Sequence, residues 1–572
     1  MAAGSQTIVI LGAGINGCAL ARELALNGLS VVLVDTADVA SGTTSYSSRL
    51  IHGGLRYLEY GDFALVRESL AERGRLLRLA PQFVRPLELF VPIRTRFSGL
   101  WQSALRFFGR DTAPAPRGRG LLLVWLGLML YDAYARDPSV PKHRLHKVAT
   151  DGANSAGTPP VNPREYHWLA SYYDAQVTYP ERLTLALLAD ASQAAAAHGQ
   201  SVQVFTYHQA RLDRQHVSIM PVGTDRAALE PFQPAAIVNA TGAWVDETLR
   251  RLEIPTERLM GGTKGSHFVT PHPALAAALG GRAIYAEAHD GRPVFILPWA
   301  GQTLVGTTDE AYTGDPRSAV ASPAELAYLL DAVRYVFPQF PLSTADVALS
   351  YAGVRPLAYT GAAASEDTTT KDTAPTTTPP AAITREHFFK RHAGITPPTY
   401  SIVGGKLTTC RSLAEETAAT LLADLGRTHA ADSRERTIPG GEAWPTDAGR
   451  ARHEIAQRTG LPPAVVDRAW QLVGTQTATI LSTAEAPAAC LRGTEFPLAL
   501  ALWSIRHEWV TRLADLVERR LMLLYQQPLQ RTTLEHLVEL LVAEGRIDAA
   551  QAEREVSLTI ERLGKHFGKQ VA

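Results

Sequence analysis

Three glycines near the start of the chain have the spacing that lets a backbone approach a pyrophosphate. They are Gly12, Gly14 and Gly17, and they follow an apolar run at residues 8–11. The first permits a tight turn, the second lets the backbone come close to phosphate oxygens, and the third lets a helix pack against a strand. The N-terminus of that helix directs unpaired N–H groups and a positive dipole end at the phosphates. The spacing therefore predicts a dinucleotide-binding turn.

An acidic residue, Asp35, ends the second apolar run, at residues 31–34. A carboxylate there can accept hydrogen bonds from ribose hydroxyls and would repel a 2′-phosphate. An alanine- and leucine-rich segment separates the two runs, so residues 7–35 have the strand–helix–strand context that the glycines require. The motif alone does not separate NAD from FAD, although its place at the N-terminus favours FAD.

Cationic side chains in glycine-rich turns form the second group of candidate residues. Residues 45–59 read SYSSRLIHGGLRYLE and place Arg49, His52 and Arg56 around a glycine pair. Similar turns follow: GTKGSH at 262–267, GTTD at 306–309, AGVRP at 352–356, TREH at 384–387 and VGGKLTTCR at 403–411. Each turn alone is typical of an ordinary loop. Together they supply the cations that a small anionic substrate requires, and the guanidinium fork suits phosphate oxygens in particular.

Composition excludes several classes of protein. The 572-residue chain has 56 basic and 56 acidic residues, and this balance argues against nucleic-acid binding. Its three cysteines, Cys18, Cys410 and Cys490, have neither disulfide nor metal-ligand spacing, which predicts free thiols in a reducing compartment and no metal site. No secretory signal pattern is recognisable, so we expect a cytoplasmic protein.

The hydrophobic pattern predicts the elements that must position these residues. It indicates helices at 63–79 and 179–198 and strands at 201–211, 217–222 and 236–240. Three further segments have their own patterns. We expect mixed strands at about 260–310, a Thr- and Pro-rich surface insertion at 360–383, and a separate helical domain after 439–441.

One apolar run, residues 121–131, is too short to span a bilayer, which needs about 20 residues as a helix. Arginines and aromatic residues precede it, between Trp101 and Arg119. Such a combination can form a contact with a membrane surface, but a core helix beside a solvated basic loop has the same sequence pattern.

Residues 14–73, from GINGCALAREL through SSRLIHGGLRYLE to SLAER, closely resemble the flavin-dependent, membrane-associated sn-glycerol-3-phosphate dehydrogenases. GTKGSH, GTTD, AGVRPL, TREH and GGKLTT occur in the order found in that family, NATGAWVD resembles its second flavin-contacting turn, and RHEWVTRLADLVERR resembles its helical cap domain. The resemblance covers most of the chain except parts of 95–165 and the 360–383 insertion.

The resemblance implies an α/β fold with an α+β substrate part. We expect a Rossmann-like FAD-binding domain of the glutathione-reductase and D-amino-acid-oxidase type, a mixed-sheet substrate domain and a C-terminal helical cap domain. The expected boundaries are 1–90 for the FAD-binding core, with contributions from about 165–260 and 385–425, then 91–165 and 260–384 for the substrate domain and insertions, and 430–572 for the helical domain.

The resemblance also assigns site residues. The implied FAD contacts are Gly12, Gly14, Ile15, Asn16, Gly17, Asp35, Thr44, Ser45, Leu50, Ile51, His52, Gly242, Gly405, Lys406, Leu407 and Thr408. The implied substrate contacts are Arg56, Tyr57, Arg355, Arg385 and Lys406. The candidate catalytic residues are His52, His267, Arg355 and Lys406. The two histidines are candidate bases because imidazole titrates near neutral pH, whereas Lys406 could serve only with a lowered pKa.

The implied reaction is oxidation of sn-glycerol 3-phosphate to dihydroxyacetone phosphate, with hydride transfer to FAD and electron delivery to membrane quinone. The family implies peripheral attachment to the inner face of the cytoplasmic membrane and leaves a homodimer open. An oxygen-using glycerol-3-phosphate oxidase, which produces hydrogen peroxide, would have much the same flavin site. A flavin-binding sensor without dehydrogenase activity is the alternative from another class, and the clustered cations argue against it.

Overall fold

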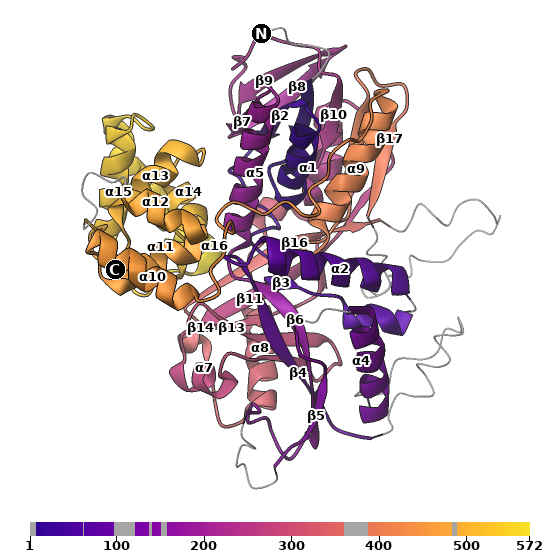
Figure 1. Cartoon of the computed structure of the whole chain (residues 1–572), viewed down its shortest axis with the longest axis vertical. Coiled ribbons are helices and arrows are strands. Elements are labelled where there is room, and N and C mark those ends of the chain that lie inside the picture. The colour runs from indigo at the N-terminus through magenta and orange to yellow at the C-terminus, as the bar shows by residue number, and fades with distance from the viewer. Residues whose placement is uncertain are drawn as a thin grey trace, which may run out of the picture.

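The computed structural model describes residues 7–60, 62–96, 120–135, 140–149, 157–359, 387–482 and 489–572, without the side chains of Arg56, Glu59 and Tyr60. Two sheets and a C-terminal helical region make up this part of the chain (Figure 1). The first sheet lies at the top of the view, the second at the bottom, and the C-terminal helices at the left.

The first sheet has the strand order β17-β18-β10-β1-β2-β7. Its strands are β1 (Thr7–Leu11), β2 (Ser30–Asp35), β7 (Val202–Thr206), β10 (Ala236–Asn239), β17 (Phe388–His392) and β18 (Thr399–Val403). All neighbours pair in parallel except β17 with β18. This doubly covered parallel sheet has its ligand-binding edge at the carboxyl ends of β1 and β2.

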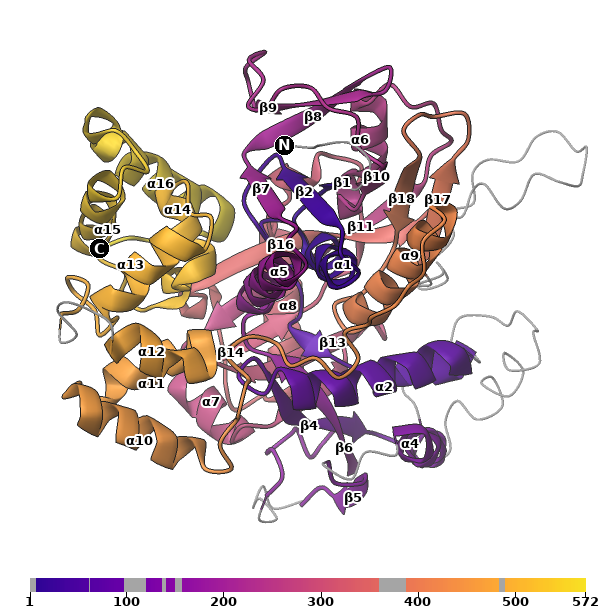
Figure 2. The ribbon, with the colours of Figure 1, turned by 45° about the horizontal axis from the view of Figure 1, so that its top comes forward.

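Alternate side chains of β1 and β2 enter two different cores, as the two-residue period of a strand requires. Ile8 and Ile10 pack with α1 (Ile15–Leu26), α5 (Pro180–Ala197) and α9 (Cys410–Asp424), which lie in front of the sheet in Figure 2. Val9 and Leu11 pack with α6 (Val245–Arg251) and the hairpin of β8 (His208–Asp213) and β9 (His216–Pro221). Both faces are therefore apolar, which explains the unbroken hydrophobic runs in the sequence.

The second sheet is mixed and has the order β15-β11-β14-β13-β12-β4-β6-β3, with β16 beside β11 and β5 beside β6. Its strands are β3 (Leu50–Ile51), β4 (Val84–Ile93), β5 (Arg144–Lys147), β6 (Trp168–Val177), β11 (Met260–Thr270), β12 (Ala283–Glu287), β13 (Pro293–Trp299), β14 (Gln302–Gly306), β15 (Glu310–Ala311) and β16 (Leu349–Ala358). The helices around it are α2 (Phe63–Leu79), α4 (Leu121–Ala135), α7 (Pro273–Leu279) and α8 (Pro323–Val336).

The C-terminal region consists of helices that share an apolar core with the second sheet. They are α10 (Ala448–Thr459), α11 (Pro463–Val473), α12 (Thr477–Ser482), α13 (Leu498–His507), α14 (Leu513–Asp515), α15 (Arg531–Ala543) and α16 (Ala552–Phe567). Buried ion pairs join this region to the first sheet's domain: Arg182 of α5 binds Glu508 at 2.7 Å, and Arg519 binds Asp38 at 2.6 Å.

The fold confirms the α/β class, the mixed sheet, the helical C-terminal region and the predicted helices at 63–79 and 179–198. The single strand predicted at 201–211 is wrong. Tyr207 adopts a positive φ of 59°, which ends β7 and turns the chain into β8. The 360–383 insertion and the basic segment before residue 120 lie outside the described residues.

Candidate functional site

Two adjoining cavities lie at the carboxyl ends of β1 and β2. The outer cavity contains Gly12 and Asp35, and the inner cavity contains His52, His267 and Arg355. The cavities adjoin because the same residues line both: Thr43, Tyr46, Ser47, Pro356, Gly405, Lys406 and Leu407. A long ligand in the outer cavity can therefore place one end in the inner cavity.

The glycine turn leaves the backbone exposed to the outer cavity. Gly12 has a φ of 105°, and a Cβ there would lie 2.7 Å from the Ala240 carbonyl oxygen. A Cβ on Gly17 would lie 1.9 Å from the Gly12 carbonyl oxygen, so Gly17 allows α1 to pack against the turn. The buried Oδ1 of Asn16 has no hydrogen-bond partner among the described residues and belongs to the cavity wall. The N-terminus of α1 fits a bound pyrophosphate, whereas the Asn16 amide oxygen is an acceptor for a hydroxyl or N–H group of a ligand.

The carboxylate of Asp35 is fixed at the far end of the outer cavity. Its Oδ2 accepts a hydrogen bond from Ala13 N at 2.7 Å, and its Oδ1 accepts one from Ala37 N at 2.8 Å. Burial raises the pKa of this carboxyl, and the two backbone donors oppose that effect. A carboxylate held in this way has lone pairs left for ribose hydroxyls, which fits the adenosine end of a dinucleotide.

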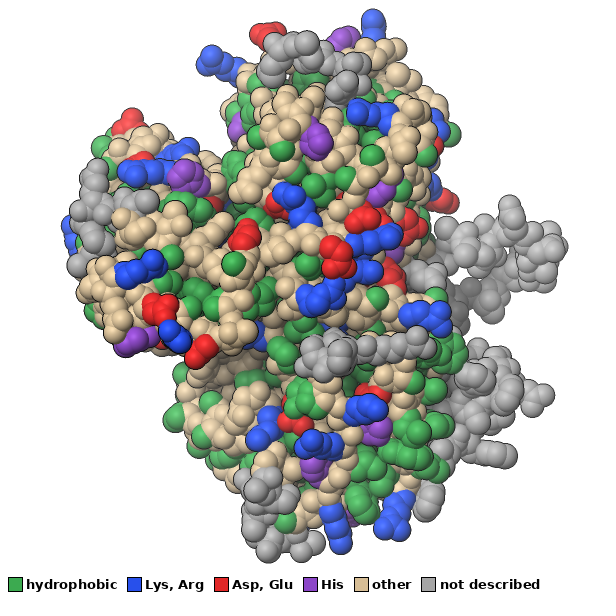
Figure 3. Space-filling model, viewed as in Figure 1, with side chains coloured by type: hydrophobic (Ala, Val, Ile, Leu, Met, Phe, Trp, Pro, Cys, Tyr) green, Lys and Arg blue, Asp and Glu red, His purple; other side chains and the backbone are tan. Residues whose placement is uncertain are grey.

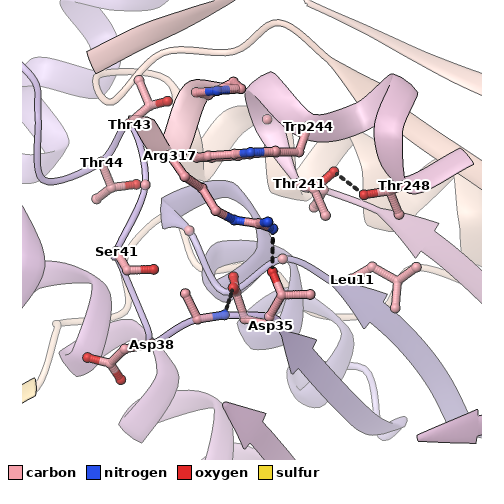
Figure 4. Close-up of a pocket in the computed structure, with 18 of the residues that line it drawn as sticks. Leu11, Asp35, Asp38, Ser41, Thr43, Thr44, Thr241, Trp244, Thr248 and Arg317 are labelled. Atoms are coloured by element: carbon pink, nitrogen blue, oxygen red, sulfur yellow. Dashed lines mark hydrogen bonds between the residues drawn. The ribbon is translucent and has the colours of Figure 1, made fainter. Parts of the chain in front are cut away.

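Arg317 reaches across this end of the cavity from the second sheet's domain (Figure 4). Its Nη2 donates to Thr36 Oγ1 at 2.9 Å, and its guanidinium lies 5.7 Å from the centre of the Trp244 ring. Asp315 Oδ1 accepts hydrogen bonds from both Arg317 N, at 2.9 Å, and Trp244 Nε1, at 3.3 Å. A planar guanidinium beside an indole is a suitable stacking surface for adenine.

The sequence analysis assigned no role to Arg317 or Trp244. GTKGSH and AGVRP lie within the strands β11 and β16 and are not the turns that were predicted, because these segments pair with each other. Residues 314–318 read GDPRS and do form a proline-fixed turn that presents an arginine. That signal was available, but only the folded chain brings the turn beside β2.

The inner cavity brings together predicted residues that are far apart in the sequence. His52 N, for example, donates a hydrogen bond of 3.1 Å to Thr408 Oγ1, which is 356 positions away. The cavity lining includes eight of the residues expected to bind cofactor or substrate: Leu50, His52, Tyr57, Arg355, Gly405, Lys406, Leu407 and Thr408. His267, the other candidate base, also lines it. Lys406 Nζ lies 4.2 Å from the centre of the Tyr57 ring, which holds the cation at the junction of the two cavities.

Arg355 is held by hydrogen bonds from both of its terminal nitrogens. Nη1 donates to Thr263 Oγ1 at 3.1 Å and to Asp309 Oδ1 at 2.9 Å. Nη2 donates to Thr307 Oγ1 and to the Thr308 carbonyl oxygen, both at 2.9 Å. The guanidinium is therefore fixed in orientation, and Asp309 offsets part of its charge.

His267 is a neutral imidazole. Burial, followed by the positive charges of Arg355 and Arg49, lowers its pKa to about 3. Nε2 lies 2.8 Å from Ser48 Oγ, and the ring stacks on Tyr351 at a centroid distance of 5.0 Å. Its Nδ1 has no hydrogen-bond partner in the described part of the chain. A neutral ring can accept a proton or a hydrogen bond.

Several predicted residues do not line either cavity. Gly17 packs α1, Ile51 lies in the core, and Ser45 Oγ donates to the Ala40 carbonyl oxygen behind the wall. The side chain of Arg56 and all of Arg385 lie outside the described residues. The remaining predicted cofactor contacts line the outer cavity: Gly12, Gly14, Ile15, Asn16, Asp35, Thr44, Gly242, Gly405, Lys406 and Leu407.

The cation of GTKGSH has a structural role. Lys264 Nζ forms an ion pair with Glu325 at 2.8 Å, and Ser266 and Thr308 donate to the same carboxylate. Although burial opposes it, these bonds lower the pKa of Glu325 to about 2. Lys264 therefore helps to hold, through Glu325, the segment between β14 and β15 that carries Thr307 and Thr308, and these residues in turn hold Arg355.

Comparisons with known proteins agree with this geometry. A family model described as FAD dependent oxidoreductase matches residues 7–371. A glycerol-3-phosphate dehydrogenase of Synechocystis is 35% identical over 468 residues, 77% of this chain and 74% of the relative. A D-erythritol 1-phosphate dehydrogenase of Brucella abortus is 30% identical over 90% of this chain and 93% of the relative. The FAD complex of a glycerol-3-phosphate dehydrogenase from Bacillus halodurans covers 98% of this chain and 95% of its own, with 21% identity and a TM-score of 0.69, which shows the same fold.

We predict that Arg317→Ala weakens FAD binding about tenfold, or about 1.4 kcal/mol, because the stacked guanidinium is lost. Titration of flavin-free protein with FAD, followed by quenching of flavin fluorescence, measures the dissociation constant. Arg334→Ala is the matched control, since Arg334 pairs with Asp331 on α8 and lines neither cavity. An Arg317→Ala affinity equal to that of the control would contradict the stacking role.

Proposed function

Since the chain belongs to the FAD-dependent oxidoreductase family, and within it to the glycerol-3-phosphate dehydrogenases, we propose that it oxidises sn-glycerol 3-phosphate to dihydroxyacetone phosphate. The observation that carries this proposal is the inner cavity, where Arg355, Lys406 and a neutral His267 converge beside the glycine turn at Gly405. Such a cavity offers cations for a phosphate and an imidazole for a hydroxyl proton.

FAD is the cofactor, and when bound it accepts the hydride from the second carbon of the substrate. The chain's own residues orient the two partners. The turn at Gly12 and the N-terminus of α1 would hold the pyrophosphate, and Asp35 the adenosine ribose. Gly405 and Lys406, which line both cavities, would border the reactive end.

Arg355 and Lys406 would bind the substrate phosphate. Because Thr263, Thr307 and Asp309 fix the guanidinium, little conformational entropy is lost when an anion binds. Binding energy from the phosphate, remote from the reacting carbon, would align that carbon for hydride transfer.

His52 and His267 are the candidates to take the hydroxyl proton. Burial, followed by the charges of Arg355 and Arg49, lowers the pKa of His267 and makes it a weak base. A bound phosphate dianion would offset the part of this lowering that comes from the two arginines and so strengthen His267 as a base. Ser48 would keep the ring in position through its 2.8 Å contact.

We predict that sn-glycerol 3-phosphate, added anaerobically to the FAD-loaded protein, bleaches the visible flavin absorbance within one turnover. Glycerol, which lacks the phosphate, should leave the flavin oxidised at the same concentration. D-erythritol 1-phosphate is the necessary comparison because one relative carries that name. If D-erythritol 1-phosphate reduces the flavin faster, that compound is the better candidate substrate. If neither compound bleaches the flavin, the proposed activity is refuted.

We predict that Arg355→Ala lowers kcat/KM for sn-glycerol 3-phosphate about 100-fold, equal to about 2.7 kcal/mol of transition-state stabilisation. Steady-state kinetics with a dye acceptor measures this change, and Arg355→Lys should recover part of it. Arg282→Ala is the control because that arginine pairs with Glu88 at 3.6 Å outside both cavities. Unchanged kinetics in Arg355→Ala would exclude the phosphate-binding role.

Membrane quinone is the acceptor that we propose, and α4 would be the contact with the membrane surface. Its outward face is apolar at helical spacing, with Leu122, Trp125, Leu126, Met129 and Leu130 between 36% and 50% exposed. Val124, Leu128 and Tyr131 face inward and are buried. In Figure 3 hydrophobic atoms gather over α4 at the lower right. A continuous exposed apolar face on a short helix fits the interface of a bilayer.

In the part of the chain that the structure describes, no helix has the length and apolar character needed to cross a membrane. Attachment through α4 would therefore be peripheral.

We predict that Leu126→Glu with Met129→Glu abolishes sedimentation with phosphatidylglycerol–phosphatidylcholine vesicles and slows reduction of ubiquinone in them about tenfold. Flavin bleaching by substrate should be unchanged. Leu558→Glu is the control, since this α16 side chain is 45% exposed and apolar but lies on another element. Equal vesicle binding by both variants would exclude α4, and rapid peroxide formation in air without quinone would favour the oxidase instead.

A further inference from the structure

The turn that carries His52 is closely packed on its far side. A Cβ on Gly53 would lie 2.4 Å from Leu70 Cδ2 and 2.5 Å from Tyr131 Oη. The backbone of the turn therefore rests directly on the side chains of Leu70 from α2 and Tyr131 from α4.

The amide of Gly53 has two acceptors at once. Its N–H donates to Tyr131 Oη at 2.9 Å and to Asp174 Oδ1 at 3.1 Å. The Tyr131 hydroxyl itself donates to Asp174 Oδ1, so it uses both its donor and its acceptor function. Arg73 Nη1 donates to the same oxygen at 3.2 Å. One carboxylate oxygen therefore accepts hydrogen bonds from α2, from α4 and from the turn.

All three side chains are buried, with 1% exposure for Tyr131, Arg73 and Asp174. Burial, and then the Asp174 carboxylate, raises the pKa of Tyr131, so its proton stays on the phenol. In a buried network of this kind each hydrogen bond restricts the others, and the loss of one partner leaves a desolvated group unsatisfied.

Strand register places this network under the inner cavity. β3 pairs with β6, with Ile51 opposite Ala175, so His52 and Gly53 follow directly beside Asp174. Asp174 also lines the inner cavity. In Figures 1 and 2 α4 lies beside α2, and β6 runs next to them.

We propose that Tyr131 and Asp174 are positioning residues, which hold the His52–Gly53 turn against the inner cavity through the Gly53 amide. Tyr131 lines neither cavity, and Asp174, which lines the inner cavity, is assigned this role through its hydrogen bond from the Gly53 amide. Their effect passes through the backbone to His52, a candidate base, so the inference rests on the proposed function for its kinetic consequence. Tyr131 lies on α4, and the turn is therefore fixed by the helix whose opposite face is exposed and apolar.

The test compares two variants of one helix. Tyr131→Phe removes the hydroxyl and keeps the buried ring. Tyr134→Phe is the matched control, because it removes a hydroxyl three residues further along α4, where the ring lies 6.2 Å from Phe63 and 5.5 Å from the Arg67 guanidinium carbon. Both variants are studied as FAD-loaded enzyme, with flavin content and melting temperature recorded first.

Hydrogen exchange is the first readout and does not depend on the substrate. In Tyr131→Phe we expect peptides that span residues 50–55 to exchange at least about fivefold faster than in Tyr134→Phe. Stopped-flow reduction by sn-glycerol 3-phosphate is the second readout. We expect the limiting rate of flavin reduction to fall about tenfold, with the half-saturating concentration unchanged, because the phosphate contacts remain.

Equal exchange and equal reduction rates in the two variants would overturn the positioning role. If wild-type flavin is not reduced by the substrate, the proposed function fails, but the exchange comparison still decides the inference. Should Tyr131→Phe fail to retain FAD, Asp174→Asn serves in its place, since it removes the charge that strengthens the hydrogen bonds from Gly53, Tyr131 and Arg73. Exchange of residues 50–55 at the wild-type rate in that variant would equally refute the inference.

Discussion

The buried guanidinium of Arg49 is the interaction on which the rest of the site depends. It binds Glu181 of α5 through two hydrogen bonds, of 2.9 and 3.0 Å, and donates to Tyr525 Oη of the C-terminal region at 2.7 Å. It also lies 4.7 Å from the centre of the Trp299 ring on β13. One side chain therefore contacts the first sheet's domain, the second sheet and the helical region. Removal of one partner from such a buried pair costs roughly 3–5 kcal/mol, so the segment that leads to His52 has little freedom to move.

The same principle explains most cations of the glycine-rich segments. Each has a buried or half-buried carboxylate partner from another part of the chain: Arg49–Glu181, Lys264–Glu325, Arg355–Asp309 and Arg411–Glu72. Burial of an unpaired charge is prohibitively costly, so the fold pairs these cations before any ligand binds. Arg355 differs from Lys264 in its greater side-chain exposure, 23% against 11%, and it lines the inner cavity, where its positive charge faces a bound anion.

The sequence predictions that rest on local signals agree best with the structure. The dinucleotide turn, its two strands and the helix at 63–79 follow from glycine spacing and periodicity within single segments, and the structure has them at these positions. The strand at 201–211 failed because the left-handed residue Tyr207 lies within an otherwise regular pattern. The run at 121–131 gave two alternatives because it is apolar on all sides, and only packing decides which face is buried. Arg317, Trp244 and Asp174 were missed because their roles depend on contacts between segments that the sequence separates.

The glycines and the cations of the motifs occur together because a fixed cationic side chain needs space beside it. Thr263 lies opposite Arg355 in the β11–β16 register, and Gly265 lies opposite Gly353. A Cβ on Gly265 would lie 2.3 Å from Arg355 Nη2 and 2.5 Å from Thr307 Oγ1, and a Cβ on Gly353 would lie 2.7 Å from Tyr46 Cβ. A large fixed side chain fits between paired strands only where the neighbouring position has no side chain of its own. Glycine in these strands therefore provides the volume that the guanidinium occupies, and a glycine pattern beside a cation indicates a packed site more strongly than either does alone.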